Sequence, residues 1–183
     1  FCTIYGLGEL GMAEGRIYSG WQIIDEIPHE ARLERYGLDF GYTNDPTAII
    51  AVYYLNGGWI FDEKVYKYGM SNKEIAETLK SMHERLVIAD SAEPKSIDEI
   101  RSYGLNIQPA KKGSDSVRNG IQLIQDQPMS ITKQSINGIK EYRNYLWMTD
   151  KEGKILNEPE KGNDHFLDAV RYAMETLGRL KQE

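Results

Sequence analysis

Three aspartates that are far apart in the sequence lie where buried elements are expected to begin or end. Asp39 lies in the strand-like stretch GLDFG, Asp90 ends the apolar run LVIAD, and Asp168 lies in the helical segment GNDHFLDAVRYA. Carboxylates are rarely buried unless they are paired or bound to a metal. If the three come together, a divalent cation would relieve their repulsion, and Mg²⁺ and Mn²⁺ prefer carboxylate oxygen and water. Two such ions about 3.5–4 Å apart can activate a water and stabilise a leaving oxygen in phosphoryl transfer.

Two more polar residues precede Asp168 in the same segment. His165 can ligate a metal through its neutral imidazole or take part in proton transfer, and Asp164 is interpreted as a helix cap rather than a ligand. The alternative is purely structural. Aspartates at strand ends often cap helices or shape turns, and Asp164, His165 and Asp168 fall opposite the apolar stripe of their helix, as a solvated face would.

Hydrophobic periodicity and turn signals predict the elements that would position these residues. Strands are expected over 37–41, 47–55 and 59–68, with an Asn-Gly hairpin turn at 56–58. A capping box at 71–74 begins a helix whose apolar positions run through Met82 to Leu86. Short strands are then expected over 86–90, 105–110 and 129–132. Helices are expected over 94–104, 114–126, 135–145 and from 163 or 164 to about 180.

This order of elements predicts an α/β fold with a mixed sheet, because three hairpin-linked strands come first and helices alternate with strands afterwards. It suits a ribonuclease H-like arrangement, in which the first and fourth strands would be neighbours and would bring Asp39 beside Asp90. An extra β-hairpin is expected over 145–157, either projecting over a cleft or lying plainly on the surface. Residues 1–36 are interpreted as a linker with one or two short strands, and residues 37–183 as the main domain.

Composition sets broad limits on the class of protein. The 183 residues suffice for one domain, and 40% hydrophobic and 27% charged residues are ordinary for a globular protein. No apolar run reaches about 18 residues, so no membrane span is expected, and no signal peptide is recognised. The net charge of −6 argues against a binder that relies mainly on electrostatic attraction to nucleic acid. The single cysteine, Cys2, excludes an intramolecular disulfide and a cysteine-based zinc site.

Three segments, in order, resemble the nuclease domain of the large terminase subunit of tailed double-stranded DNA bacteriophages. They are GLDFGYTNDPTAIIAVYY, VIADSAEPKSIDEIRSYGLNIQPAKKGSDSVRNGIQLIQ and NDHFLDAVRYAMETL, and the resemblance covers about residues 37 to 180. It implies a ribonuclease H-like domain that cuts double-stranded concatemeric viral DNA with little sequence preference. It also implies that Asp39, Asp90 and Asp168 hold Mg²⁺ or Mn²⁺, two ions being expected, with His165 contributing to the metal site or to proton transfer.

The resemblance further implies partners. Proteins of that family carry an N-terminal ATPase domain, but no Walker P-loop occurs here. We therefore expect a piece of a longer protein, in which residues 1–36 form the junction from the ATPase domain. The portal protein and the small terminase subunit would be partners. The site of action would be the host bacterial cytoplasm, at the procapsid, and the protein would not be a stable virion component.

Basic residues after the predicted fifth strand could contact DNA phosphates. Lys111, Lys112 and Arg118 would give salt-dependent binding without sequence preference, although such residues are often simply solvated. Two other functions stay open. One is a module that docks DNA or the portal and has negligible nuclease activity alone. The other is a different ribonuclease H-like nuclease, such as a junction resolvase.

Overall fold

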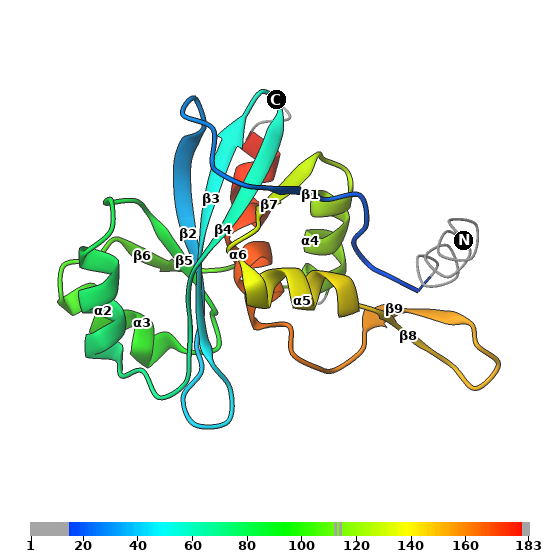
Figure 1. Cartoon of the computed structure of the whole chain (residues 1–183). Helices are drawn as coiled ribbons and strands as arrows, with labels where there is room; N and C mark the ends of the chain where they lie inside the picture. Colours follow the sequence, from blue (N-terminus) through cyan, green and yellow to red (C-terminus); the bar gives the residue numbers. More distant parts are fainter. Residues whose placement is uncertain (1–14, 112, 114, 181–183) are drawn as a thin grey trace.

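A computed structural model describes residues 15–111, 113 and 115–180 of the chain. Its main feature is a seven-stranded mixed sheet in the order β1-β7-β4-β3-β2-β5-β6, with helices on both faces (Figure 1). The strands of this sheet are β1 (Gln22–Ile24), β2 (Arg32–Asp39), β3 (Thr47–Leu55), β4 (Gly58–Lys67), β5 (Val87–Ala89), β6 (Ile107–Pro109) and β7 (Met129–Thr132). The helices are α2 (Asn72–Lys80), α3 (Pro94–Ser102), α4 (Ser116–Gln125), α5 (Ile136–Asn144) and α6 (His165–Leu180).

The first three long strands form an antiparallel meander. β3 pairs with β2 on one side and with β4 on the other, and both pairings are antiparallel. The turn between β3 and β4 contains Asn56 at φ 50° and Gly57 at φ 81°, and residues that tolerate positive φ favour such tight turns. All other pairings in the sheet are parallel. The predicted mixed sheet, antiparallel first and parallel afterwards, is confirmed.

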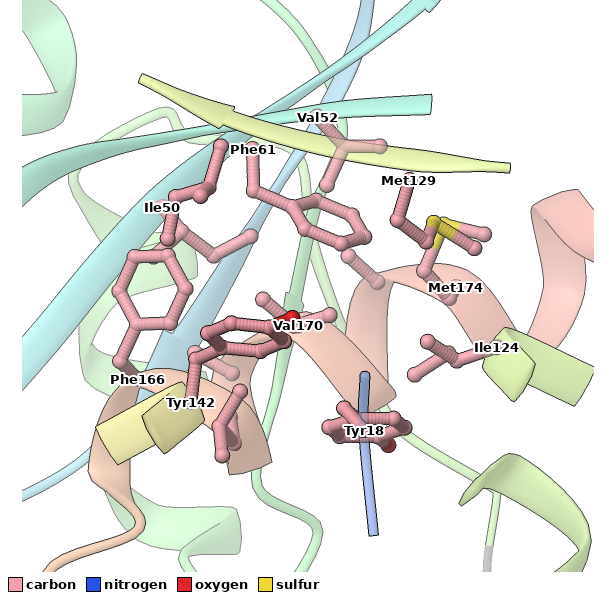
Figure 2. Close-up of a cluster of buried hydrophobic side chains, with 14 of the residues drawn as sticks. Tyr18, Ile50, Val52, Phe61, Ile124, Met129, Tyr142, Phe166, Val170 and Met174 are labelled. Carbon is pink, nitrogen blue, oxygen red and sulfur yellow. The ribbon is translucent and has the colours of Figure 1, made fainter. Parts of the chain in front are cut away.

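Hydrophobic residues on the two faces of the sheet form two cores. Alternate residues of β3 point to opposite faces, so that Ile50 and Val52 belong to one cluster and Ile49 and Ala51 to the other. The first cluster lies under α4, α5 and α6, and the second lies under α2 and α3. Figure 2 shows the first cluster, in which Phe61 and the sheet residues face Val170 and other side chains of α6.

α6 is the most buried helix of the fold. Its apolar residues Phe166, Ala169, Val170, Ala173 and Met174 have no exposed surface. It crosses the sheet over β2 and β3 and also contacts β5, α4 and α5. The sequence prediction of a final helix with an apolar stripe is therefore confirmed. The stripe faces the sheet and not the solvent.

The chain before residue 37 contributes to the same sheet and core. β1 pairs with β7, and the first half of β2 extends the pairing with β3 back to Arg32. Tyr18 is 2% exposed and stacks against Trp21 and Tyr145. Residues 15–36, expected as a linker with short strands, thus hold two strand segments and part of the core. Residues 1–14 lie outside the described part of the chain, and a domain boundary near residue 36 stays a prediction.

One further difference concerns the extent of α2. α2 ends at Lys80, so that Met82 and Leu86 lie beyond it. Beyond the helix, the carbonyl of Leu86 accepts a hydrogen bond from Tyr36 N at 3.0 Å, which aligns the following β5 with β2. The predicted extra hairpin is confirmed as β8 (Trp147–Thr149) and β9 (Ile155–Pro159), an antiparallel pair outside the main sheet.

Among the helices of the described ranges, none has both the length and the apolar character needed to cross a membrane.

Candidate active site

The carboxyl ends of β2 and β5 bring Asp39 and Asp90 to one edge of the sheet. Asp39 is the last residue of β2, Asp90 directly follows β5, and the two strands pair in parallel with Leu38 opposite Ala89. The amide of Asp90 donates to the carbonyl of Leu38 at 3.2 Å. Because parallel neighbours end at the same edge, the predicted proximity of these two strands places both aspartates on it.

α6 places a second set of polar residues over the same edge. Gly37, two residues before Asp39, permits this: a Cβ there would lie 2.0 Å from the carbonyl oxygen of Ala169. The first turn of α6 therefore reaches the end of β2. His165 Nδ1 lies 3.2 Å from Asp39 Oδ2, and His165 Nε2 lies 3.4 Å from Oδ1 of Asp45, in the loop after β2. The histidine bridges two carboxylates.

The other predicted site residues have their own protein partners. Asp168 Oδ1 accepts from Arg171 Nη2 at 3.2 Å, and Arg171 also contacts Glu175. Asp90 Oδ1 accepts from the amide of Ala92 at 2.9 Å. In the described part of the chain, no three His, Cys, Asp or Glu side chains stand close enough together to hold a metal ion. Of the four predicted residues, only Asp39 and His165 are in direct contact.

Burial and mutual repulsion raise the pKa values of Asp39 and Asp168 at this edge. Asp39 is 6% exposed, and burial raises its pKa; Asp90 and Asp164 act in the same direction, whereas the hydrogen bond from His165 opposes them. The pKa of Asp168 is raised to about 7, first by burial and then by Asp164 and Asp39, despite the Arg171 guanidinium. These residues therefore feel one another's charge even where they do not touch.

The same negative charge raises the pKa of His165 as well. Its hydrogen bond to Asp39 raises the pKa of the imidazole above its ordinary value, against the effect of burial. A cluster of hard oxygen donors and one imidazole, destabilised by crowded negative charge, is chemically suited to a divalent cation such as Mg²⁺ or Mn²⁺. The residues present fit such an ion.

Comparison with known families separates the ribonuclease H-like candidates from one another. The family described as Terminase RNAseH like domain matches residues 39–176 of the chain. This chain belongs to the terminase RNase H-like domain family. The match begins at Asp39 and includes Asp90, His165 and Asp168, so it covers all the predicted site residues.

Two curated terminases are similar to this family member. The large terminase subunit of Bacillus phage SPP1 is 34% identical over 172 residues, which cover 86% of this chain and 40% of that protein. The PBSX phage terminase large subunit of Bacillus subtilis strain 168 is 27% identical over 150 residues, covering 77% of this chain and 34% of that protein. The chain thus spans well under half the length of these relatives.

Solved terminase structures have the same fold. The nuclease domain of the SPP1 large terminase, solved with bound Mn, is 31% identical, with a TM-score of 0.74 over 86% of this chain and 97% of that chain. The large terminase nuclease of thermophilic phage G20c, solved with bound magnesium, has a TM-score of 0.66 at 15% identity over 88% of this chain and 97% of that chain. The predicted ribonuclease H-like fold and the resemblance to large terminases are confirmed.

Sequence reasoning missed an acidic residue that lies beside the predicted site residues. Glu141 on α5 is 4% exposed; it accepts from the amide of Leu167 at 3.2 Å and from the hydroxyl of Tyr66 at 2.6 Å. Burial raises its pKa to about 7. A signal was present, because Glu141 lies three residues after Gly138 and one before Tyr142, both on the buried side of α5. A carboxylate on that side needs a partner.

Two grooves flank the edge that carries Asp39. One has a volume of about 660 Å³ and lies between the end of β4, α5 and the segment before α6. Its lining includes Tyr66, Tyr68, Asn137, Lys140, Glu141, Asn144, Lys161 and Asp164. The other also has a volume of about 660 Å³ and is lined by loop residues 40–45 together with Ser71, Asn72, Glu93 and Ser96.

Of the residues predicted to contact DNA, Lys111 lies at this side of the sheet. Lys111 is exposed and follows β6, whose carboxyl end lies at the same edge as that of β5. Arg118, on α4, is exposed and lies 3.4 Å from Asp115. Lys112 lies outside the described residues. Contact of any of them with DNA stays a prediction, as does a gating role for the β8–β9 hairpin.

Proposed function

We propose that this chain is the nuclease domain of a phage large terminase and cuts double-stranded viral DNA in a metal-dependent reaction. The observation that carries the proposal is the convergence of Asp39, Asp90 and the first turn of α6 on one sheet edge. At that edge the carboxyls of Asp39 and Asp168 have raised pKa values. A surface that only docks DNA gains nothing from gathering negative charge, whereas a metal-dependent hydrolase needs it.

Asp39, Asp90 and Asp168 would hold Mg²⁺ or Mn²⁺, with two ions as the expected number. When bound, such ions supply a Lewis acid and a water of lowered pKa for phosphodiester hydrolysis. The protein groups have separate roles. Arg171 orients the carboxylate of Asp168, and His165, freed from Asp39, holds or moves a proton at a ring nitrogen. The bound Mn of the SPP1 nuclease domain supports this choice of ion.

DNA would lie across the sheet edge, with its two strands directed by the flanking grooves. Lys140 and Lys161 in the first groove, together with the predicted Lys111, Lys112 and Arg118, would contact phosphates. Phosphate contacts fix position without reading bases, so we propose cutting with little sequence preference. Hydrolysis would leave a 3′-hydroxyl and a 5′-phosphate.

The roles of the whole protein are part of the same proposal, because the chain spans 40% of the SPP1 subunit. In the intact terminase an ATPase domain would precede this chain, and the nuclease would cut concatemeric DNA during genome packaging. The portal protein and the small terminase subunit would be its partners, in the host cytoplasm at the procapsid.

One observation favours a second candidate, a module that docks DNA or the portal and does not cut alone. Asp39 and Asp168 are each held by a protein cation or imidazole, at 3.2 Å in both cases. These contacts offset part of the negative charge that a metal ion would otherwise neutralise. A cutting assay on the chain itself separates the two candidates.

The test is cutting of supercoiled plasmid with Mn²⁺, Mg²⁺ or EDTA. The variant Asp90→Asn keeps the shape of the side chain and removes its charge. Asp98→Asn is the matched control, because Asp98 is an exposed residue of α3 that pairs with Arg101. We expect metal-dependent nicking by the unmodified chain and by Asp98→Asn, and none by Asp90→Asn with an unchanged melting temperature. Retained cutting by Asp90→Asn would sink the assignment, and no cutting by the folded unmodified chain would favour the docking module.

A further inference from the structure

Glu141 connects three elements at the site edge. It lies on α5, accepts the amide of Leu167 in the first turn of α6 at 3.2 Å, and accepts the hydroxyl of Tyr66 on β4 at 2.6 Å. The first amides of a helix have no partner inside the helix. Glu141 thus caps α6 from a neighbouring helix. The amide that it caps belongs to Leu167, which lies between His165 and Asp168 in the sequence.

Tyr66 fixes the carboxylate that makes this cap. Its hydroxyl donates to one oxygen of Glu141 while the other oxygen accepts from Leu167. The ring of Tyr66 also meets the ring of His165 edge-on, with 6.2 Å between centroids. The same pair of residues therefore contacts the backbone of α6 and the side chain of its first residue.

We propose that Glu141 is a positioning residue of the nuclease, which holds the first turn of α6 so that His165 and Asp168 face Asp39. The inference rests on the proposed function, because it assigns Glu141 a task for that metal site. Glu141 itself lies outside the predicted metal ligands. It acts through the backbone of Leu167.

Stability alone is a poor reason to place a carboxylate there. Glu141 is 4% exposed, and an apolar side chain of similar volume would avoid the cost of burying it. That cost is visible in its raised pKa. What an apolar residue cannot do is accept two hydrogen bonds in fixed directions. The geometry therefore points to orientation of α6 as the use of this residue.

The chain offers a matched control one helix away. Glu63 on β4 accepts the amide of Gly138 at 2.8 Å and the side-chain amide of Asn137 at 3.0 Å, and so caps α5 in the same manner. Glu63→Ala and Glu141→Ala both remove a carboxylate cap that comes from another element. Only the second removes the cap of the helix that carries His165 and Asp168.

The experiment uses the full chain and two readouts that need no cutting. In EDTA, NMR signals of the His165 ring, assigned with His165→Gln, report its contact with Asp39. In a Mn²⁺ titration, the EPR signal of free Mn²⁺ gives the affinity. We expect Glu141→Ala to shift the His165 signals and to weaken Mn²⁺ binding roughly tenfold or more, as loss of a supporting group around a metal site does. Glu141→Gln, which still accepts from Leu167, should restore most of both.

The outcomes distinguish failure of the positioning role of Glu141 from failure of the proposed nuclease function. If Glu141→Ala keeps the His165 signals and the Mn²⁺ affinity of the unmodified chain, the inference is overturned. It is also overturned if Glu63→Ala shifts both as strongly, because loss of a cap on α5 then has the same effect as loss of the cap on α6. If the unmodified chain binds no Mn²⁺, the proposed function fails, and the His165 signals alone decide whether Glu141 positions α6.

Discussion

Replacing Gly37 by alanine tests whether the close approach of α6 to β2 builds the site. Gly37 lies on β2, two residues before Asp39. A Cβ at this position would lie 2.0 Å from the carbonyl oxygen of Ala169 and 3.3 Å from Cβ of Ala173. Because the nearest neighbour is backbone and not the end of a flexible side chain, the strand and the helix must separate.

The size of the separation follows from that distance. Ordinary contact of a Cβ begins at 3.4 Å, and the difference from 2.0 Å requires a shift of about 1.4 Å between β2 and α6. A misplacement of about 1 Å can cost roughly 100-fold in rate. Overpacking of a core typically costs about 1–3 kcal/mol. For a domain of this size each kcal/mol lowers the melting temperature by about 2–4 °C.

The assay compares Gly37→Ala with Gly58→Ala. Gly58 begins β4, and a Cβ there would meet its nearest atom, the carbonyl oxygen of Pro128, at 3.4 Å. The control thus adds the same methyl group to the same sheet where there is room. We expect Gly37→Ala to lose about 100-fold in plasmid cutting with Mn²⁺, and Gly58→Ala to keep it. Both melting curves should stay cooperative.

A clear result would contradict this reasoning. If Gly37→Ala cuts within a few-fold of the unmodified chain, with the same melting temperature, then α6 does not need to approach β2 this closely. The positions of His165 and Asp168 relative to Asp39 would then not depend on the missing side chain. If instead the variant loses cutting and is partly unfolded at the assay temperature, Mn²⁺ binding to the folded fraction at low temperature still measures the site.

Two further predictions concern pH and metal. The pKa of Glu141 is raised to about 7 from an ordinary 4.5, so the folded protein loses stability as pH rises through this range and the carboxyl loses its proton. Glu141→Gln, which stays neutral, should therefore have a higher melting temperature than the unmodified chain at pH 8 but not at pH 5. An equal difference at both pH values would refute this. Mn²⁺ should raise the melting temperature of the unmodified chain more at pH 8 than at pH 6, because protons compete for Asp168, whose pKa is raised to about 7. If the rise in melting temperature caused by Mn²⁺, measured against EDTA, is the same at both pH values, Asp168 does not bind the ion.

Much of the fold is predictable because its signals are local. The apolar run at 47–55 is β3 with its predicted bounds, since a continuous β-branched and aromatic stretch followed by Asn56-Gly57 has one good solution. The capping box at Ser71 begins α2 because Ser71 Oγ accepts the amide of Glu74 at 3.1 Å. Asp39 and Asp90 were predictable as neighbours because both end strands that a ribonuclease H-like sheet places side by side.

The missed features depend on contacts between distant segments. The start of β2 at Arg32 is set by pairing with Tyr54, more than twenty residues later. Glu141 and Asp45 gain their roles only when α5 and the loop after β2 meet α6. The buried side of α5 signals that Glu141 needs a partner, but no local pattern identifies that partner. The partners of Asp168 and Asp39 likewise depend on side-chain directions. A sequence can place these residues at an edge, but it does not say that Arg171 and His165 hold them.

Three glycines on different elements explain why the packing of α6 determines both the stability of the fold and the geometry of the site. Gly37 on β2 lies against Ala169. A Cβ on Gly120 of α4 would lie 2.6 Å from Cγ of Arg171, and one on Gly138 of α5 would lie 2.6 Å from the ring of Phe166. All three neighbours belong to α6, so the helix is held from three directions at distances that no side chain permits. Because α6 also carries His165 and Asp168, changes in the packing of its buried face move the site. The site therefore depends on this packing as much as on its ligands.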